Sequence, residues 1–322
     1  MNTSTPGERA ADRPGRDRRT ASGRPAARSM KPPVFSKSTF VHLRLAFFFY
    51  LTPVFLFSLA VSPRLDWLRA GLAFFIIHFL LYPASNGFNS YYDRDEKGIG
   101  GIRNPPAVTP DLLLAVNLLD LLAVGLGFIL GRVFSLGLLF YIIASRLYSW
   151  DKTRLKRRPV LSWLMVGLGQ GTAVFLMSFQ AVNKAVLSEL LSWKVCGAAL
   201  LAGFFLLASY PMTQVYQHEE DRRRGDRTMS MLLGVRGTFL FCFLALTAVA
   251  SGYASYFFIF SGKLQAAAFL LCLVPSFAYF IAWRRSVLAD ESRADFRRTM
   301  AMNTVTSLGL NLFFVVFLLF SR

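Results

Sequence analysis

Two short polar stretches interrupt a chain that is otherwise strongly apolar. In the first, residues 89–95, Asn89 and Asp93 lie four residues apart, and in the second Gln217 and Asp221 have the same spacing. Residues four apart share one face of a helix, so each pair presents an oxygen ligand and a carboxylate to the same volume. Carboxylates beside Arg and Lys at a membrane surface indicate a divalent metal ion and a phosphorylated substrate.

The first motif predicts part of a magnesium site. Mg²⁺ prefers oxygen ligands and commonly bridges carboxylates to substrate phosphates, so Asn89 and Asp93 are suitable ligands if the preceding helix continues. Asp95 can join them only if the helix bends or ends, and the glycines within residues 98–101 predict an early end. Arg94 is predicted to bind the substrate phosphates. A helix cap solvated at the membrane interface is the alternative explanation of this motif.

The second motif repeats the pattern with more charge. Gln217 and Asp221, with the adjoining Glu220, are predicted metal ligands, and Arg224 belongs to a basic run that can bind a diphosphate. A charged loop with locally paired ions is the alternative. Each motif directly follows an apolar segment long enough to cross a bilayer, and two such motifs on one side of a membrane favour the metal and diphosphate site.

A third polar loop lies between the two motifs in sequence. It contains Tyr148, Arg154 and Lys156. Arg154 and Lys156 are predicted to hold the non-bridging phosphate oxygens, and Tyr148 is predicted to contact the substrate beside them. Basic residues on one side of a membrane also fix its topology, and this second explanation of the loop stays open.

The composition predicts that these motifs are carried by a membrane-embedded bundle. The chain has 322 residues, is 54% hydrophobic and has a mean hydropathy of +0.43. Apolar segments of spanning length recur to the C-terminus, so we predict an all-α, polytopic membrane bundle of about nine transmembrane helices around a central cavity. The predicted spans are 41–61, 68–86, 110–131, 133–148, 160–182, 193–211, 235–260, 264–283 and 301–320.

The formal net charge of +18 reflects topology rather than nucleic-acid binding. All but seven of the 36 Lys and Arg residues fall on the side of the membrane that carries the N-terminus and both motifs. By the positive-inside rule this side is cytoplasmic. We therefore predict a multi-pass integral membrane protein whose site lies on the cytoplasmic face, in contact with membrane lipid and without a nucleic-acid partner.

Residues 1–38 differ from the rest of the chain. They are rich in Arg, Pro, Ser, Gly and Ala and show no apolar periodicity, so we predict a disordered basic segment before a transmembrane domain at 39–322. The segment lacks the apolar core of a cleaved secretory signal. An organelle transit peptide and a translation start at Met30 are two further interpretations of its composition.

At the two motifs the chain resembles the UbiA superfamily of membrane-embedded prenyltransferases. In that family Asn-x-x-x-Asp-x-x-x-Asp follows the second helix, and Asp-x-x-x-Asp-x-x-x-Gly-x-x-Thr follows the sixth. Asn89 and Asp93 match the first pattern. Asp221, Gly225 and Thr228 match the second at its spacing. The basic loop after the fourth span also resembles the family's, and the resemblance covers nearly all of the predicted transmembrane domain.

Two positions depart from the family pattern. Lys97 stands where the first motif ends in Asp, and Gln217 stands where the second begins with Asp. Asp95 for the first motif, and Glu219 or Glu220 for the second, are the acids that could compensate. These changes leave open the metal stoichiometry, the acceptor, and a family member that binds isoprenoid diphosphates without turning them over.

The resemblance implies Mg²⁺-dependent transfer of an isoprenoid chain from a prenyl diphosphate to a small-molecule acceptor, usually an aromatic ring as in quinone synthesis. It implies catalytic roles for Asp93, Asp221, Arg154 and Lys156, because a metal ion and basic side chains neutralise the leaving diphosphate. A polytopic transporter is the alternative from another class of protein. Asp120, inside the third span, is the one hint of it, and we find no internal repeat in support.

Overall fold

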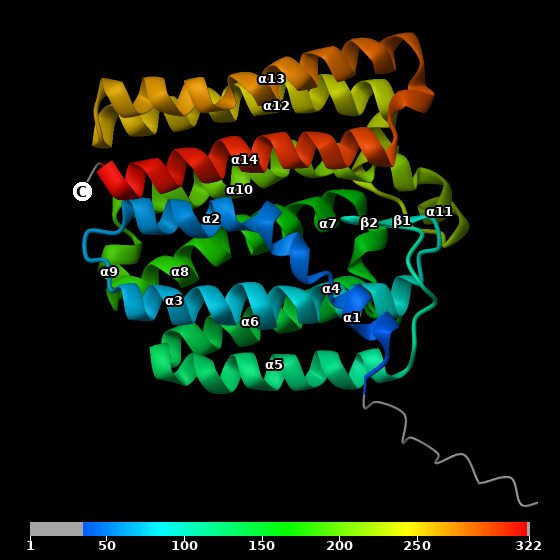
Figure 1. Ribbon diagram of the computed structural model, residues 1–322, viewed down its shortest axis with the longest axis horizontal. Coiled ribbons are helices and arrows are strands. Elements are labelled where there is room, and N and C mark those ends of the chain that lie inside the picture. Colours follow the sequence, from blue (N-terminus) through cyan, green and yellow to red (C-terminus); the bar gives the residue numbers. More distant parts are fainter. Residues whose placement is uncertain (1–34, 321–322) are drawn as a thin grey trace, which may run out of the picture. The chain divides into compact units, whose positions relative to one another are not determined.

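The computed structural model describes residues 35–320, and helices make up almost all of this part of the chain (Figure 1). Within it the only strands form one antiparallel hairpin, in which Gly98 pairs with Arg103. The predicted all-α class is confirmed. The elements are α1 Lys37–Leu43, α2 Phe48–Val61, α3 Trp67–Phe75, α4 Tyr82–Asp93, β1 Gly98–Ile99, β2 Ile102–Arg103, α5 Asp111–Leu130, α6 Arg132–Ser149, α7 Pro159–Val166, α8 Val174–Asn183, α9 Leu187–Leu190, α10 Trp193–Gln214, α11 His218–Arg223, α12 Met229–Phe260, α13 Lys263–Ala289 and α14 Phe296–Phe320.

Eight helical segments of the described chain are long and apolar enough to cross a membrane. Two of them join neighbouring elements through a π-helical segment, which connects α3 to α4 and α7 to α8. These eight correspond to eight of the nine predicted spans, and the chain is an integral membrane protein. They are Lys37–Val61, Trp67–Asp93, Asp111–Leu130, Pro159–Asn183, Trp193–Arg223, Met229–Phe260, Lys263–Ala289 and Phe296–Phe320.

The ninth predicted span, 133–148, is the continuous helix α6. It has 18 residues and packs along α4, α5 and α8, with Arg132 as its first residue and Arg146 in its last turn. Arg146 forms an ion pair with Asp120 of α5 and lies 3.8 Å from the centre of the Phe88 ring. The intramembrane acid that suggested a transporter therefore has a partner within the α5–α6 pair.

The predicted N-terminal segment, 1–38, and the suggested start at Met30 lie largely or wholly outside the described residues. The last residues of the segment are described and begin α1. Ser36 caps this helix by accepting the Thr39 N–H, and its own N–H donates to the Asp111 carboxylate at 2.7 Å. The start of α1 is thereby fixed to the start of α5.

Helix α10 lies at the centre of the helix packing and contacts several other elements of the bundle. It packs against α2, α7, α8 and α12, and against the π-helical segment Gly167–Ala173 (Figure 1). At Gly171 an added Cβ would lie 2.5 Å from the Cα of Gly203, so only glycine permits this approach. Small residues at helix crossings in membranes allow such close backbone packing.

An aromatic cluster holds α2, α12, α13 and α14 together at the end of the bundle remote from the two motifs. Phe57 stacks on Phe314 at 5.3 Å between ring centres, and Tyr253 stacks on Phe269 at 5.1 Å. These rings are buried, and aromatic pairs of this kind stabilise a core beyond the area that they bury.

Candidate active site

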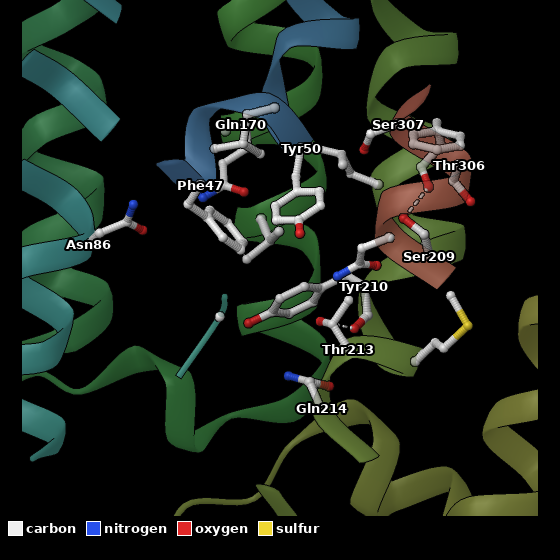
Figure 2. Close-up of a pocket in the computed structure, with 18 of the residues that line it drawn as sticks. Phe47, Tyr50, Asn86, Gln170, Ser209, Tyr210, Thr213, Gln214, Thr306 and Ser307 are labelled. Atoms are coloured by element: carbon white, nitrogen blue, oxygen red, sulfur yellow. Dashed lines mark hydrogen bonds between the residues drawn. The ribbon is translucent and has the colours of Figure 1, made fainter. Parts of the chain in front are cut away.

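A cavity of about 340 Å³ lies among α2, α4, α6, α10, α13 and α14. Tyr50 of α2 and Tyr210 of α10 point into it, as Figure 2 shows. Its far end is closed by the stacked rings of Tyr253 and Phe269, and much of its wall is apolar. The opposite end is polar and is lined by both predicted motifs. Their cavity-lining residues are Asn89, Asp93, Asp95, Gln217, Asp221 and Arg224.

The first motif begins in the last turns of α4 and continues past the end of that helix. Asn89 and Asp93 both line the cavity, as their spacing predicted, and the Asn89 side-chain oxygen accepts a hydrogen bond from Ser149 Oγ at 2.9 Å. The helix ends directly after Asp93, because Arg94 takes a left-handed conformation with φ of 50°. This turn sends the Arg94 side chain to the surface, where it is exposed and does not line the cavity. The predicted contact of Arg94 with the substrate has no support in this geometry.

The chain leaving α4 returns Asp95 to the cavity. Asp95 is buried and forms an ion pair with Arg224, which also lines the cavity. Burial raises the pKa of Asp95 to about 6, and the negative charge of Asp93 adds to this effect. Because the helix ends at Asp93, Asp95 lies beside it at the cavity. This is the condition under which the sequence predicted that Asp95 could join the site.

The second motif is not one continuous helix. A short 3₁₀ turn, Val215–Gln217, precedes α11, and both Gln217 and Asp221 line the cavity. Asp221 is buried there. The amide nitrogen of Gln217 donates to the carbonyl oxygen of Gly98 at 3.2 Å, so its side-chain oxygen is the atom that could bind a metal ion.

Glu220 does not reach the cavity with the other predicted ligands. Its carboxylate accepts the backbone N–H groups of Glu96 at 3.1 Å and Lys97 at 2.9 Å. Glu219 pairs instead with the Lys97 ammonium at 2.5 Å, and both of these side chains are more than half exposed. Lys97, which stands where the family pattern has an acid, therefore points away from the cavity. Glu220 holds the loop that follows the first motif.

The two predicted phosphate-binding residues of the basic loop before α7 lie in different places. Lys156 lines the cavity and is paired with Asp93. Arg154 is buried behind it, outside the lining, and binds Asp226 through Nε at 2.8 Å and Nη2 at 2.9 Å. Tyr148 lines the cavity, and its hydroxyl lies 2.7 Å from that of Tyr210. Lys156 and Tyr148 thus line the cavity, whereas Arg154 lies outside its lining.

Two charged residues of this site were missed by the sequence reasoning. Arg44 lines the cavity from the break between α1 and α2 and donates to the Asn86 carbonyl oxygen at 3.1 Å. Asp226 lines the cavity beside the second motif. Burial acts to raise the pKa of Asp226, but the hydrogen bonds from Arg154 and the charge of Lys156 outweigh it and lower that pKa. Asp226 occupies a variable position between Gly225 and Thr228 of the second motif, where an acid was a visible signal, whereas nothing local marks Arg44.

The donor set fits Mg²⁺ in one particular way. Among the described residues, no group of three His, Cys, Asp or Glu side chains is gathered closely enough to hold a metal ion by itself. Asp93 and Asp221 instead face one cavity from two motifs. Mg²⁺ keeps several waters and is usually bound by one or two carboxylates together with substrate phosphates, so a phosphorylated ligand would complete such a site.

The fold and the cavity together define a membrane-embedded helical protein with an acidic and basic site at one end of an apolar cavity. The chain belongs to the UbiA prenyltransferase family, whose sequence profile matches residues 48–305. A comparison with curated protein sequences found no match.

Solved structures of UbiA homologues share this fold. The homologue from Archaeoglobus fulgidus bound to DMAPP and Mg²⁺ superposes with a TM-score of 0.64 at 17% identity, over 87% of this chain and 99% of that one. The same homologue bound to GPP and Mg²⁺ gives 0.62 at 17% identity, with the same coverage. The apo homologue from Aeropyrum pernix K1 gives 0.61 at 14% identity, over 84% and 97% of the two chains.

Proposed function

We propose that this protein is a Mg²⁺-dependent prenyltransferase that moves an isoprenoid chain from a prenyl diphosphate to a small-molecule acceptor. The observation that carries the proposal is the meeting of Asp93 and Asp221, from distant motifs, at one end of a cavity whose remainder is largely apolar. The homologues bound to DMAPP or GPP with Mg²⁺ have the same fold and support this assignment.

The residues at the polar end suit a diphosphate leaving group. Asp93 and Asp221, with the oxygens of Asn89 and Gln217, are the groups that would hold Mg²⁺, which neutralises the diphosphate when bound. Lys156 provides an ammonium group at the same end. As the allylic carbon–oxygen bond breaks, both of its electrons leave with the diphosphate oxygen, and fixed positive charge stabilises that oxygen.

The cavity wall suits the other half of the reaction. The rings of Tyr148 and Tyr210 lie between the polar and the apolar parts, where an aromatic face can stabilise an allylic cation. The apolar wall holds the isoprenoid tail and excludes water that would capture the cation. The acceptor forms the new bond to the allylic carbon, and the proton that it loses passes to a base at the polar end or to solvent.

The acceptor that we propose is an aromatic ring of the kind used in quinone or related lipid biosynthesis. We further propose that the site and the N-terminus lie on the cytoplasmic face, because most Lys and Arg residues fall on that side. The catalytic unit on this view is the transmembrane domain 39–322, with 1–38 as a separate basic segment in the cytosol.

Purified protein reconstituted in lipid tests the proposal. With geranyl diphosphate and a panel of aromatic acids, diphosphate should be released only when Mg²⁺ is present, and a chelator should stop it. If folded protein releases none with any acceptor, catalysis is refuted. Binding of geranyl diphosphate without turnover would instead identify a non-catalytic binding protein, and solute uptake by proteoliposomes without prenyl transfer would identify a transporter.

A further inference from the structure

Asp226 is the most enclosed acid of the site, and no motif predicts it. It follows Gly225, which has a φ of 72° in the turn after α11, and its backbone N–H donates to the Asp221 carbonyl oxygen at 2.9 Å. Its side chain is 1% exposed. The turn after α11 therefore places a further buried carboxylate at the cavity wall, with the other acids of the site.

Asp226 forms ion pairs with three residues of the basic loop, Arg154, Lys156 and Arg157. Arg154 approaches Asp226 through two nitrogens at 2.8 and 2.9 Å, but its nearest approach to Asp93 is 3.5 Å. Lys156 bonds to Asp93 and lies 3.3 Å from Asp226. Arg154 is thus held by a bidentate pair with Asp226 and makes only one longer contact, at 3.5 Å, with Asp93.

This division of partners has a consequence for Asp93. A bidentate pair between an arginine and a carboxylate is strong and geometrically specific. A buried arginine that loses this partner is costly, so we expect it to move toward another acid. Asp93 is the other buried carboxylate within reach of Arg154. Lys156 and Arg154 both contact Oδ1 of Asp93, so a closer arginine would also engage Oδ2, the oxygen that Asp93 could offer to a metal ion.

We propose that Asp226 is a positioning residue that keeps the second carboxylate oxygen of Asp93 available to a divalent cation, by restricting Arg154 to one long contact with Asp93. The inference rests on the proposed function. Asp226 itself is not the ligand in this arrangement, because both of its oxygens are engaged by Arg154. Its effect on the cation is exerted through Arg154 and then through Asp93.

Binding of Mn²⁺, followed by electron paramagnetic resonance with geranyl diphosphate present, tests this arrangement without turnover. Asp226→Asn should raise the half-saturating Mn²⁺ concentration about tenfold, a typical coupling within a buried charge network. Asp226→Asn combined with Arg154→Gln should return it to within about threefold of wild type, because the released arginine is gone. Asp151→Asn is the matched control, since Asp151 also pairs with Arg154 at 2.8 Å but is exposed, and it should leave Mn²⁺ binding unchanged.

The possible outcomes separate the competing explanations. An unchanged Mn²⁺ response in Asp226→Asn overturns the inference. A double variant as weak as Asp226→Asn, or weaker, also overturns it and makes Asp226 a ligand or a purely structural group. Should Asp226→Asn fail to fold, Arg154→Gln alone is expected to bind Mn²⁺ as well as wild type, and weaker binding refutes the inference. Wild-type protein that binds neither Mn²⁺ nor geranyl diphosphate refutes the proposed function itself.

Discussion

The two acidic motifs share one spacing but are built and used differently. The first is the rigid end of α4, and both Asn89 and Asp93 face the cavity from it. The second is divided between a 3₁₀ turn and α11, and it sends Asp221 to the cavity but Glu220 to the backbone of the opposite loop. Both motifs therefore bring an amide and a carboxylate to the cavity, and the second also fixes the opposite loop through Glu220.

The difference shows how one motif supports the other. The loop after α4 has no helix of its own to fix it, and the second motif supplies the contacts. Glu220 accepts two of its backbone N–H groups, Gln217 donates to Gly98, and Arg224 pairs with Asp95. The departures from the family pattern thus belong to a set of contacts that joins the two halves of the site.

Removing the acid that faces the cavity from either motif should have the largest effect. We expect Asp93→Asn and Asp221→Asn each to lower prenyl transfer at least about a hundredfold, because each removes a charge that would hold the cation at the leaving group. Turnover of geranyl diphosphate by reconstituted protein measures this. Asp151→Asn, at an exposed acid of the same face, serves as control. Full activity in either variant would contradict the prediction that both acids are needed to hold the cation.

The basic residues offer the next largest contrast. Lys156→Met should lower kcat/KM for the prenyl diphosphate roughly tenfold or more, since the Lys156 ammonium lines the cavity. Arg94→Gln should change it by less than about twofold, because Arg94 is exposed beyond the end of α4 and a single screened charge acts weakly. Equal losses in the two variants would show that general positive charge, and not position, binds the diphosphate.

Sequence patterns predict this fold well because lipid leaves few choices. A segment that crosses a bilayer must satisfy its backbone hydrogen bonds internally, so long apolar runs become helices. Eight of the predicted spans meet the length and apolarity needed to cross, and α6 is helical where the ninth was expected. The β1–β2 hairpin was not predicted, because two pairs of residues on either side of a glycine turn carry too little periodicity to detect.

Side-chain placement at the site follows most directly from the sequence where a helix continues. Asn89 and Asp93 share a face because α4 reaches Asp93, so their spacing was enough. Beyond the helix end, side-chain direction depends on single backbone angles and on tertiary contacts. The left-handed conformation of Arg94 turned a predicted phosphate ligand to the surface, and Arg44 reaches the cavity from a break between helices. Neither placement is encoded in a local pattern.

Glu220 of the second motif should contribute more to the stability of the protein than to its catalytic activity. Glu220→Ala should lower the free energy of unfolding by about 1.5 kcal/mol, because two backbone N–H groups lose a charged acceptor. Thermal unfolding in detergent measures this. The matched variant Glu219→Ala should leave the unfolding temperature nearly unchanged, since its pair with Lys97 is exposed. An equal effect of the two substitutions would mean that Glu220 does not hold the loop.

Lys97→Asp should produce the smallest change, although it restores the acid of the family pattern. The Lys97 side chain points to Glu219 at the surface and away from the cavity, so an acid there would not reach a metal ion held by Asp93. We expect activity within about twofold of wild type, because an exposed ion pair contributes little and is screened by salt. Mg²⁺ titration of geranyl diphosphate turnover checks this. A markedly lower Mg²⁺ requirement in the variant would show that the loop can turn inward, and that the contacts from the second motif do not fix it.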